Sequence, residues 1–246
     1  MTQILLEIKN LSFSYKNKKP VFENISLSVK EGQLIGLLGE NGAGKTTLFN
    51  LIKGGRMKFS GTMYKEFSES ELITLPQVVN LSGTLKNFEI FDLICCFNRL
   101  TRSQAEKKLQ LRWSDDFFYR YEKIKDKRAY AVSYGEKRWL TISLMLGLCD
   151  RSRFFLLDEP TVGIDIQYRM LLWDLIDMIV REGKTVLFST HILDELTREK
   201  IPFFMLSKKG LSQYSDMHSF MKVKNSQTPE QAFISEILTK NPRNDV

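Results

Sequence analysis

Three short runs of apolar residues stand out along the chain, each bounded by residues typical of turns. They are Leu34–Leu38, Phe154–Leu157 and Thr185–Phe188. Continuous apolar runs of this length are typical of strands buried on both faces of a parallel sheet. Between the last two runs, Gln167–Glu182 carries apolar residues at helical spacings, and Gly183 follows it as a natural helix end. The order strand, helix, strand predicts an α/β core.

The first thirty residues show a different pattern, in which apolar and polar residues alternate. Leu6–Phe13 and Ile25–Val29 both have this alternation. It is typical of antiparallel strands that bury one face and expose the other. We therefore expect an antiparallel β subdomain at the N-terminus, beside the α/β core.

The middle of the chain, at about residues 78–150, is richer in helix formers, above all in Ser103–Leu111 and Gly135–Leu148. We interpret it as a helical subdomain inserted into the core. Beyond about residue 210 the chain is polar and basic, with one short amphipathic stretch at Pro229–Leu238. The expected division is a main domain over residues 1–210, with the helical subdomain inserted at about 78–150, and a short C-terminal tail over 211–246.

Composition narrows the class of protein only a little. No apolar run reaches the roughly 18 residues that suggest a membrane span, and the N-terminus lacks the features of a signal peptide. The spacing of Cys95, Cys96 and Cys149 suits neither a disulfide framework nor a metal site, so we expect reduced thiols in a cytosolic protein. The formal net charge of +7 suits nucleic acid, an anionic membrane surface or plain solubility, and does not choose among them.

A glycine-rich segment, Gly39–Thr46, matches the P-loop pattern without a gap. It follows the apolar run Leu34–Leu38 and precedes the helix-compatible Thr47–Lys53, which is the context that the motif requires. Glycines let such a loop curl so that backbone N–H groups and a helix N-terminus face phosphate oxygens. Lys45 would neutralise charge on the β- and γ-phosphates, and the Thr46 hydroxyl would bind Mg²⁺. The segment predicts nucleotide binding.

Two carboxylates, Asp158 and Glu159, end the apolar run at Phe154–Leu157. Asp158 would hold Mg²⁺, directly or through water. Glu159 could then act as the general base that polarises an attacking water. A solvated strand end is the alternative interpretation, and the P-loop in the same chain disfavours it.

Together these residues resemble the ATP-binding subunits of ABC transporters, over about residues 4–210. The Walker A motif would be Gly39–Thr47, and Phe154–Asp158 would be Walker B. Val132–Arg138 resembles the family signature, usually Leu-Ser-Gly-Gly-Gln, although Val, Glu and above all Tyr134 depart from it. The resemblance implies a P-loop NTPase (RecA-like) core with an N-terminal antiparallel β subdomain and an inserted helical subdomain.

The resemblance also implies a set of site residues. Those implied to bind ATP are Tyr15, Gly39, Asn41, Gly42, Ala43, Gly44, Lys45, Thr46, Thr47, Gln77, Ser133, Gly135 and Glu136. Those implied to bind Mg²⁺ are Thr46, Gln77 and Asp158, and those implied to be catalytic are Lys45, Glu159 and His191. Tyr15 would stack on adenine, Gln77 would sense the γ-phosphate, and His191 would be the switch histidine. Thr161–Asp165 resembles the D-loop that crosses the dimer interface.

By the same resemblance, two subunits would close around two ATP molecules. Each ATP would lie between the Walker A motif of one subunit and the signature of the other. A homodimer is the expected assembly, bound to a separate transmembrane permease subunit at the cytoplasmic face of the cell membrane. Hydrolysis would reopen the dimer and drive transport.

Two other classes of protein compete with this interpretation. ATPases of DNA repair would need a long coiled coil between the Walker A motif and the signature, but only about 80 residues lie there. Ribosome-associated relatives usually carry two cassettes in one chain, and this chain has one. We therefore expect no nucleic-acid partner. The second class, a degenerate subunit that only binds ATP, is disfavoured by the presence of Lys45, Asp158, Glu159 and His191. The ending at Thr228–Leu238 resembles that of bacterial export-type cassettes and favours export over import.

The segment Val78–Phe97 lies where the family places its docking groove for the membrane subunit, and it is unusually apolar. Its large apolar residues are Leu81, Leu85, Phe88, Ile90, Phe91, Leu93, Ile94 and Phe97. Some of them must pack the subdomain itself. The remainder are expected to form an exposed apolar patch of the kind that marks an interaction site.

Overall fold

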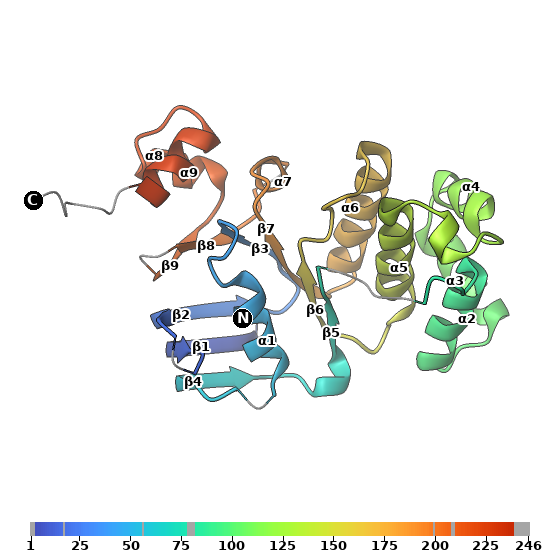
Figure 1. Ribbon diagram of the computed structural model, residues 1–246, viewed down its shortest axis with the longest axis horizontal. Coiled ribbons are helices and arrows are strands. Elements are labelled where there is room, and N and C mark those ends of the chain that lie inside the picture. Colours follow the sequence, from blue (N-terminus) through green and yellow to red (C-terminus); the bar gives the residue numbers. More distant parts are fainter. Residues whose placement is uncertain are drawn as a thin grey trace, which may run out of the picture.

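The computed structural model describes residues 3–16, 18–55, 57–77, 82–198, 200–207 and 210–238. Its N-terminal part is a three-stranded antiparallel sheet in the order β2-β1-β4 (Figure 1). The strands are β1 (Ile4–Ser14), β2 (Pro20–Lys30) and β4 (Ser60–Lys65). The alternating segments at residues 6–13 and 25–29 lie within β1 and β2, so the prediction of antiparallel strands is confirmed.

The second sheet has six strands in the order β5-β6-β7-β3-β8-β9, and all neighbours are parallel except β8 and β9. The strands are β3 (Leu34–Gly39), β5 (Leu72–Leu75), β6 (Phe154–Asp158), β7 (Thr185–Thr190), β8 (Phe203–Ser207) and β9 (Gly210–Tyr214). Every residue of β6 and β7 is buried, as the continuous apolar runs predict. Since β3 and β6 both pair with β7, the carboxyl ends of these three strands lie side by side.

Apolar cores cover both faces of the parallel sheet. Alternate residues of β6 point to opposite sides: Phe154 and Leu156 join the core with the N-terminal sheet, and Phe155 and Leu157 join the other. Helix α1 (Lys45–Lys53) packs into the first core through Leu48, Phe49, Leu51 and Ile52. Helices α5 (Tyr134–Leu148) and α6 (Ile166–Arg181) pack into the second core. The predicted helix Gln167–Glu182 corresponds to α6.

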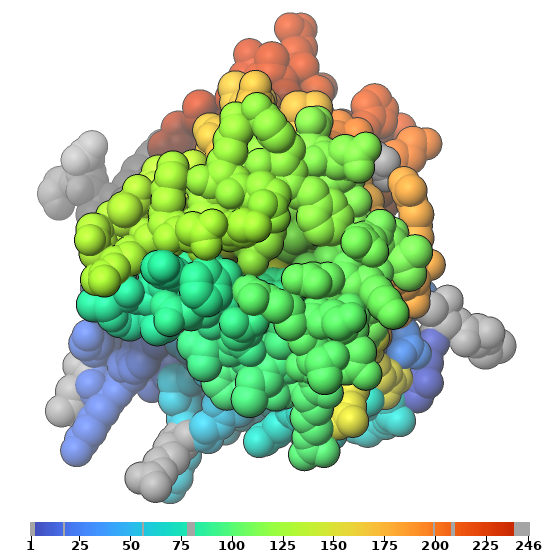
Figure 2. Space-filling model, turned by 90° about the vertical axis from the view of Figure 1, so that its right-hand side faces the viewer, coloured from blue at the N-terminus to red at the C-terminus, as the bar shows by residue number. Residues whose placement is uncertain are grey.

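Four helices form the end of the molecule away from the N-terminal sheet (Figure 1). They are α2 (Asn87–Phe97), α3 (Arg102–Arg112), α4 (Asp115–Ile124) and α5. Aromatic rings pack between them and α6, for example Phe117 on Trp139 with centroids 4.3 Å apart and Trp139 on Tyr168 at 4.7 Å. Figure 2 shows this end, where residues of α2 to α4 form most of the visible surface. Short 3₁₀ helices at Glu69–Glu71 and Ala129–Ala131 complete the connections.

The segment after residue 210 is more folded than its polar composition predicts. Strand β9 pairs with β8 and forms the edge of the six-stranded sheet. Helices α8 (Met217–Val223) and α9 (Pro229–Leu238) follow it, and the short α7 (Asp194–Thr197) lies before β8. The Phe220 ring is fully buried, with its centroid 5.6 Å from that of Phe203 in β8. A few apolar side chains, among them Met217 and Phe220, hold α8 on the sheet. The average polarity of the segment does not reveal this contact.

The described residues include no helix that is both long enough and apolar enough to span a membrane.

Candidate nucleotide-binding site

The P-loop connects β3 to α1 and has the backbone shape that an anion cradle requires. Gly42 and Gly44 have φ angles of +82° and +105°, which side chains other than glycine rarely adopt. A Cβ at Gly44 would also lie 2.8 Å from atoms of Val21 and Phe22. The loop ends at the N-terminus of α1, where free N–H groups and the helix dipole favour a phosphate. These features support the predicted cradle at Gly39–Thr46.

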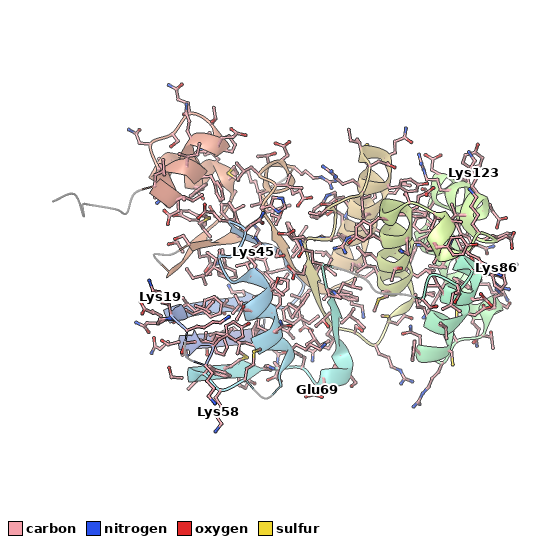
Figure 3. All side chains as sticks on the ribbon, viewed as in Figure 1. Lys19, Lys45, Lys58, Glu69, Lys86 and Lys123 are labelled. Carbon is pink, nitrogen blue, oxygen red and sulfur yellow. The ribbon has the colours of Figure 1, made fainter. Side chains whose placement is uncertain are left out.

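Lys45, the first residue of α1, lies near the middle of the molecule (Figure 3). Its ammonium donates hydrogen bonds to the carbonyls of Gly39 (2.8 Å) and Glu40 (3.1 Å). It also lies 3.4 Å from Glu159 Oε1, and both side chains are 6% exposed. The cation is therefore held inside the loop and beside the acidic end of β6.

The three residues predicted to bind Mg²⁺ meet at one cavity. The Thr46 hydroxyl donates to Asp158 Oδ2 at 2.6 Å, and Ser189 Oγ donates to Asp158 Oδ1. Thr46, Gln77 and Asp158 all line a cavity of about 320 Å³. Hard oxygen ligands of this kind fit Mg²⁺, which uses one or two carboxylates and fills its other positions with water and phosphate oxygens. The part of the chain that the structure describes contains no cluster of three or more His, Cys, Asp or Glu side chains able to hold a metal.

Several of the predicted site residues converge on Glu159. Gln77 Nε2 donates to its Oε2 at 2.8 Å, and His191 Nδ1 lies 3.0 Å from its Oε1. Its backbone N–H donates to the carbonyl (3.2 Å) and the hydroxyl (3.0 Å) of Ser189. Glu159 has a φ of +48°, which is unusual for a residue with a side chain and marks backbone strain of the kind found at functional sites. The end of β6 thus aims a buried carboxylate at Lys45, Gln77 and His191 together.

The signature residues begin α5. Ser133 is the N-cap: its hydroxyl accepts from the N–H of Glu136 at 3.1 Å, while Glu136 Oε2 accepts from the N–H of Ser133 at 2.8 Å. This reciprocal capping box orders the start of the helix. A Cβ at Gly135 would lie 2.4 Å from the carbonyl of Gly163, so the glycine permits close approach to the predicted D-loop. Among the described residues, no hydrogen bond joins Ser133, Gly135 or Glu136 to the P-loop.

Comparison with known proteins identifies the family of this chain. The ABC transporter family matches residues 22–162, more than half of the chain. The chain belongs to the ABC transporter family. It is an ATP-binding and ATP-hydrolysing subunit, of the kind that works with membrane components.

Two relatives and two solved structures illustrate the similarity. Protein McbF of Escherichia coli is 61% identical over 96% of this chain and 96% of its own length. The Nod factor export ATP-binding protein I of Rhizobium meliloti is 30% identical over 79% of this chain and 59% of its own length. An ATP-binding subunit of an ABC transporter has a TM-score of 0.74 at 22% identity, over 94% of this chain and 99% of that one. A nucleotide-free ATP-binding cassette from an ABC transporter has a TM-score of 0.70 at 18% identity, over 94% of this chain and 99% of that one. The structural likenesses show that the fold is that of an ABC ATPase.

Two residues near the site were not singled out from the sequence. Arg138 in α5 is buried and contacts the ends of two loops, and Glu195 in α7 is 3% exposed. Glu195 accepts hydrogen bonds from Thr161 in the predicted D-loop and from Thr190, next to His191, the latter at 2.6 Å. Burial raises the pKa of the Glu195 carboxyl above its ordinary value. Charged residues in a helix usually face solvent, so neither residue carries a local signal of burial.

Tyr15 lies beside the start of α1 with one part of its ring open to solvent. Its hydroxyl is 3.1 Å from Thr47 Oγ1, and its ring meets the edge of Phe13 with centroids 4.9 Å apart. The side chain is 41% exposed. An exposed ring fixed next to the phosphate cradle is placed to stack on a base.

Tyr15→Ala is expected to weaken the binding of ATP and of GTP by similar factors, of about 2- to 12-fold, because stacking of aromatic groups contributes about 0.5–1.5 kcal/mol. Titration with fluorescent analogues of both nucleotides measures the effect. Tyr15→Phe is the matched control, since it keeps the ring and removes only the contact with Thr47. If Tyr15→Ala bound ATP as tightly as the wild type, Tyr15 would only pack against Phe13.

Proposed function

We propose that this chain binds ATP with Mg²⁺ in a dimer of two copies and powers export of a substrate through a separate membrane subunit. The observation that carries the proposal is the convergence of Lys45, Gln77 and His191 on the buried Glu159. The sequence predicts a role at the bound nucleotide for each of these residues.

Thr46, Gln77 and Asp158 would hold Mg²⁺. When bound, the ion would neutralise charge on the β- and γ-phosphate oxygens. Asp158 is already aligned for this role, because Ser189 and Thr46 each donate to a different oxygen of its carboxylate. The P-loop N–H groups and Lys45 would hold the phosphates from the other side.

Glu159 would accept the proton of the attacking water. Gln77 and His191 contact different oxygens of the carboxylate and so fix its plane. The ammonium of Lys45 lies 3.4 Å from Oε1 of the same carboxylate. Phosphoryl transfer depends mainly on positioning and charge neutralisation, so this fixed geometry is a large part of the catalysis.

A second copy of the chain would complete each site. The signature residues Ser133, Gly135 and Glu136 cap α5, and their hydrogen bonds do not reach the P-loop of their own chain. The N-terminus of a helix attracts an anion. We infer that α5 of one copy faces the γ-phosphate held by the P-loop of the other, in a homodimer.

Export is the favoured direction of transport. One relative at 30% identity is named for export of Nod factor. The ending at Thr228–Leu238, which resembles that of export-type cassettes, contains the helix α9 (Pro229–Leu238). A peripheral position on the cytoplasmic face of the membrane would bring the chain to a permease subunit, and no nucleic-acid partner is proposed.

Helix α2 is the proposed docking surface for the permease subunit, but fewer of its residues are available than the sequence suggested. Ile90 and Phe91 are each 1% exposed and belong to the core. Leu93 and Phe97 are exposed, Phe97 by 82%. Phe88 lies under the cations of Lys86 and Arg102, each 5.5 Å from its ring centroid. Leu85, Phe88 and Ile94 are half-buried, and Val78–Leu81 lies outside the described residues.

The double variant Leu93→Asp/Phe97→Asp is expected to release the chain from membranes that contain its permease subunit while ATP binding persists. Both side chains face solvent, so charge there removes an apolar contact without disturbing the core. Membrane fractionation of the co-expressed pair, with a nucleotide-binding assay on the released chain, measures both effects.

Leu111→Asp is the matched control, because Leu111 is 86% exposed on the neighbouring helix α3. It should leave membrane attachment unchanged. Equal attachment of the double variant and the control would exclude α2 as the docking surface. Sedimentation of the wild-type chain with ribosomes or DNA in place of membranes would contradict the proposed transport function.

A further inference from the structure

Arg138 is a buried cation whose guanidinium is surrounded by main-chain carbonyls. The side chain is 1% exposed. It donates to the carbonyl oxygens of Pro76 (3.3 Å), Gln77, Asp158 (2.9 Å), Glu159 (2.7 Å) and Pro160 (3.1 Å). Burial lowers the pKa of this guanidinium, and the charge is offset by the carbonyl dipoles. The planar group with five donors suits such a cage, which an ammonium could satisfy only in part.

These carbonyls belong to two different loops. One loop carries Gln77 and follows β5; the other carries Glu159 and follows β6. Arg138 itself lies one turn into α5, the helix that begins with the signature residues. A single side chain therefore connects the signature helix to Gln77, which contacts the catalytic carboxylate, and to Glu159, which carries it.

Tyr134 adds a second connection to the same loop. Its hydroxyl donates to the Gln77 carbonyl at 2.9 Å, and Arg138 Nη1 lies 3.4 Å from that hydroxyl. Its ring lies against the D-loop, since a Cβ at Gly163 would be 3.0 Å from it. Tyr134 stands where the usual signature has glycine, which could make none of these contacts.

The connection ends at a strained part of the backbone. Glu159, at a φ of +48°, is held by Ser189 through its N–H and by Arg138 through its carbonyl. Such a conformation persists only where surrounding contacts fix it. A small rotation of α5 would therefore displace the Glu159 peptide. Through Gln77 it would also displace the Glu159 carboxylate.

We infer that Tyr134 and Arg138 are positioning residues that link the two ATP sites of the dimer. The inference rests on the proposed function, in which α5 engages the ATP held by the partner. When that ATP binds to the signature, α5 moves. Arg138 and Tyr134 transmit the movement to Gln77 and Glu159 of their own site. Nucleotide in one site thereby sets the catalytic carboxylate of the other.

The test uses the full chain and two variants, Arg138→Lys and Tyr134→Phe, and measures hydrolysis rate against ATP concentration. The wild type is expected to give a Hill coefficient above 1 and up to about 2, the limit for two coupled sites. Both variants are expected to lower the coefficient towards 1. Misplacement of Glu159 should also reduce kcat of Arg138→Lys by about 10- to 100-fold. Affinity of a single site for a fluorescent ATP analogue should persist, because neither side chain contacts the P-loop.

Matched controls separate coupling from folding. Arg112→Lys alters another guanidinium that joins helices, through Asp150, Glu182 and the Gly147 carbonyl, and Tyr130→Phe alters a tyrosine that is 69% exposed. Both should keep the wild-type Hill coefficient. A purely structural role would lower the melting temperature or kcat of the Arg138 and Tyr134 variants and leave their coefficients unchanged.

The outcomes distinguish this inference from the proposed function. If the wild type dimerises and hydrolyses ATP with a coefficient near 1, or if Tyr134→Phe and Arg138→Lys both keep the wild-type coefficient, the link between the sites is overturned. If the wild type neither dimerises with ATP nor hydrolyses it, the proposed function itself fails. Should Arg138→Lys not fold, Tyr134→Phe, which removes one hydroxyl from a half-exposed ring, still decides the matter.

Discussion

Glu159→Gln is expected to bind ATP and almost to stop hydrolysing it. The amide keeps the size of the side chain but cannot accept the proton of the attacking water, and general base catalysis contributes about 10²- to 10⁴-fold to such rates. One amide oxygen still accepts from Gln77 or His191, so the end of β6 should stay folded. Release of phosphate at saturating ATP measures the loss.

The same variant is expected to remain closed as a dimer, because the bridging nucleotide is not consumed. Light scattering should show a doubling of mass that appears with ATP and Mg²⁺ and disappears on their removal. Glu182→Gln, at the end of α6 in an ion pair with Arg112, is the control and should hydrolyse as the wild type does. Turnover of Glu159→Gln at the wild-type rate would show that another group is the base.

Much of the core could be predicted because strands that are buried on both faces consist of continuous apolar runs. Residues 154–157 and 185–188 are apolar at nearly every position, and in the structure these strands are central and wholly buried. The P-loop could be predicted equally well, because the backbone has φ angles above +80° at Gly42 and Gly44 and therefore requires glycine there. Local chemistry determines both features, so a short segment contains the information.

Features that depend on distant contacts could not be predicted in the same way. Helix α2 is apolar on several sides, so periodicity does not tell the buried Phe91 from the exposed Phe97. The segment after residue 210 packs on the sheet through Met217 and Phe220, two apolar residues in a polar surrounding. In each case the partner surface lies far away in the sequence.

The residues of the candidate site also differ in how far the sequence predicts them. The sequence identifies Gln77, Glu159 and His191 by their motifs, and the structure adds that Gln77 and His191 take different oxygens of one carboxylate. Arg138 has no motif of its own, because its function depends on carbonyls from segments about 20 and 60 residues away. Tyr134, a departure from the signature, acquires a role only when its hydroxyl is seen on the Gln77 carbonyl.

Lys45→Ala is expected to weaken ATP binding by about 10- to 150-fold, because a hydrogen bond to a charged group contributes about 1.5–3 kcal/mol. In the structure the ammonium is buried, satisfied by the carbonyls of Gly39 and Glu40, and 3.4 Å from Glu159. Alanine leaves the negative phosphates without this cation and also removes positive charge beside the catalytic carboxylate, so turnover should fall with affinity. Equilibrium titration with ATP and Mg²⁺, alongside steady-state hydrolysis, measures both.

Lys107→Ala is the matched control, because Lys107 is exposed on α3, away from the P-loop. It should bind and hydrolyse ATP as the wild type does, which separates loss of a phosphate contact from loss of net positive charge. Lys45→Met, which keeps most of the length of the side chain, should behave as Lys45→Ala does, since the cause is the missing charge. Wild-type affinity and turnover in both Lys45 variants would mean that Gly39–Thr46 does not hold the phosphates, and the nucleotide site would have to lie elsewhere.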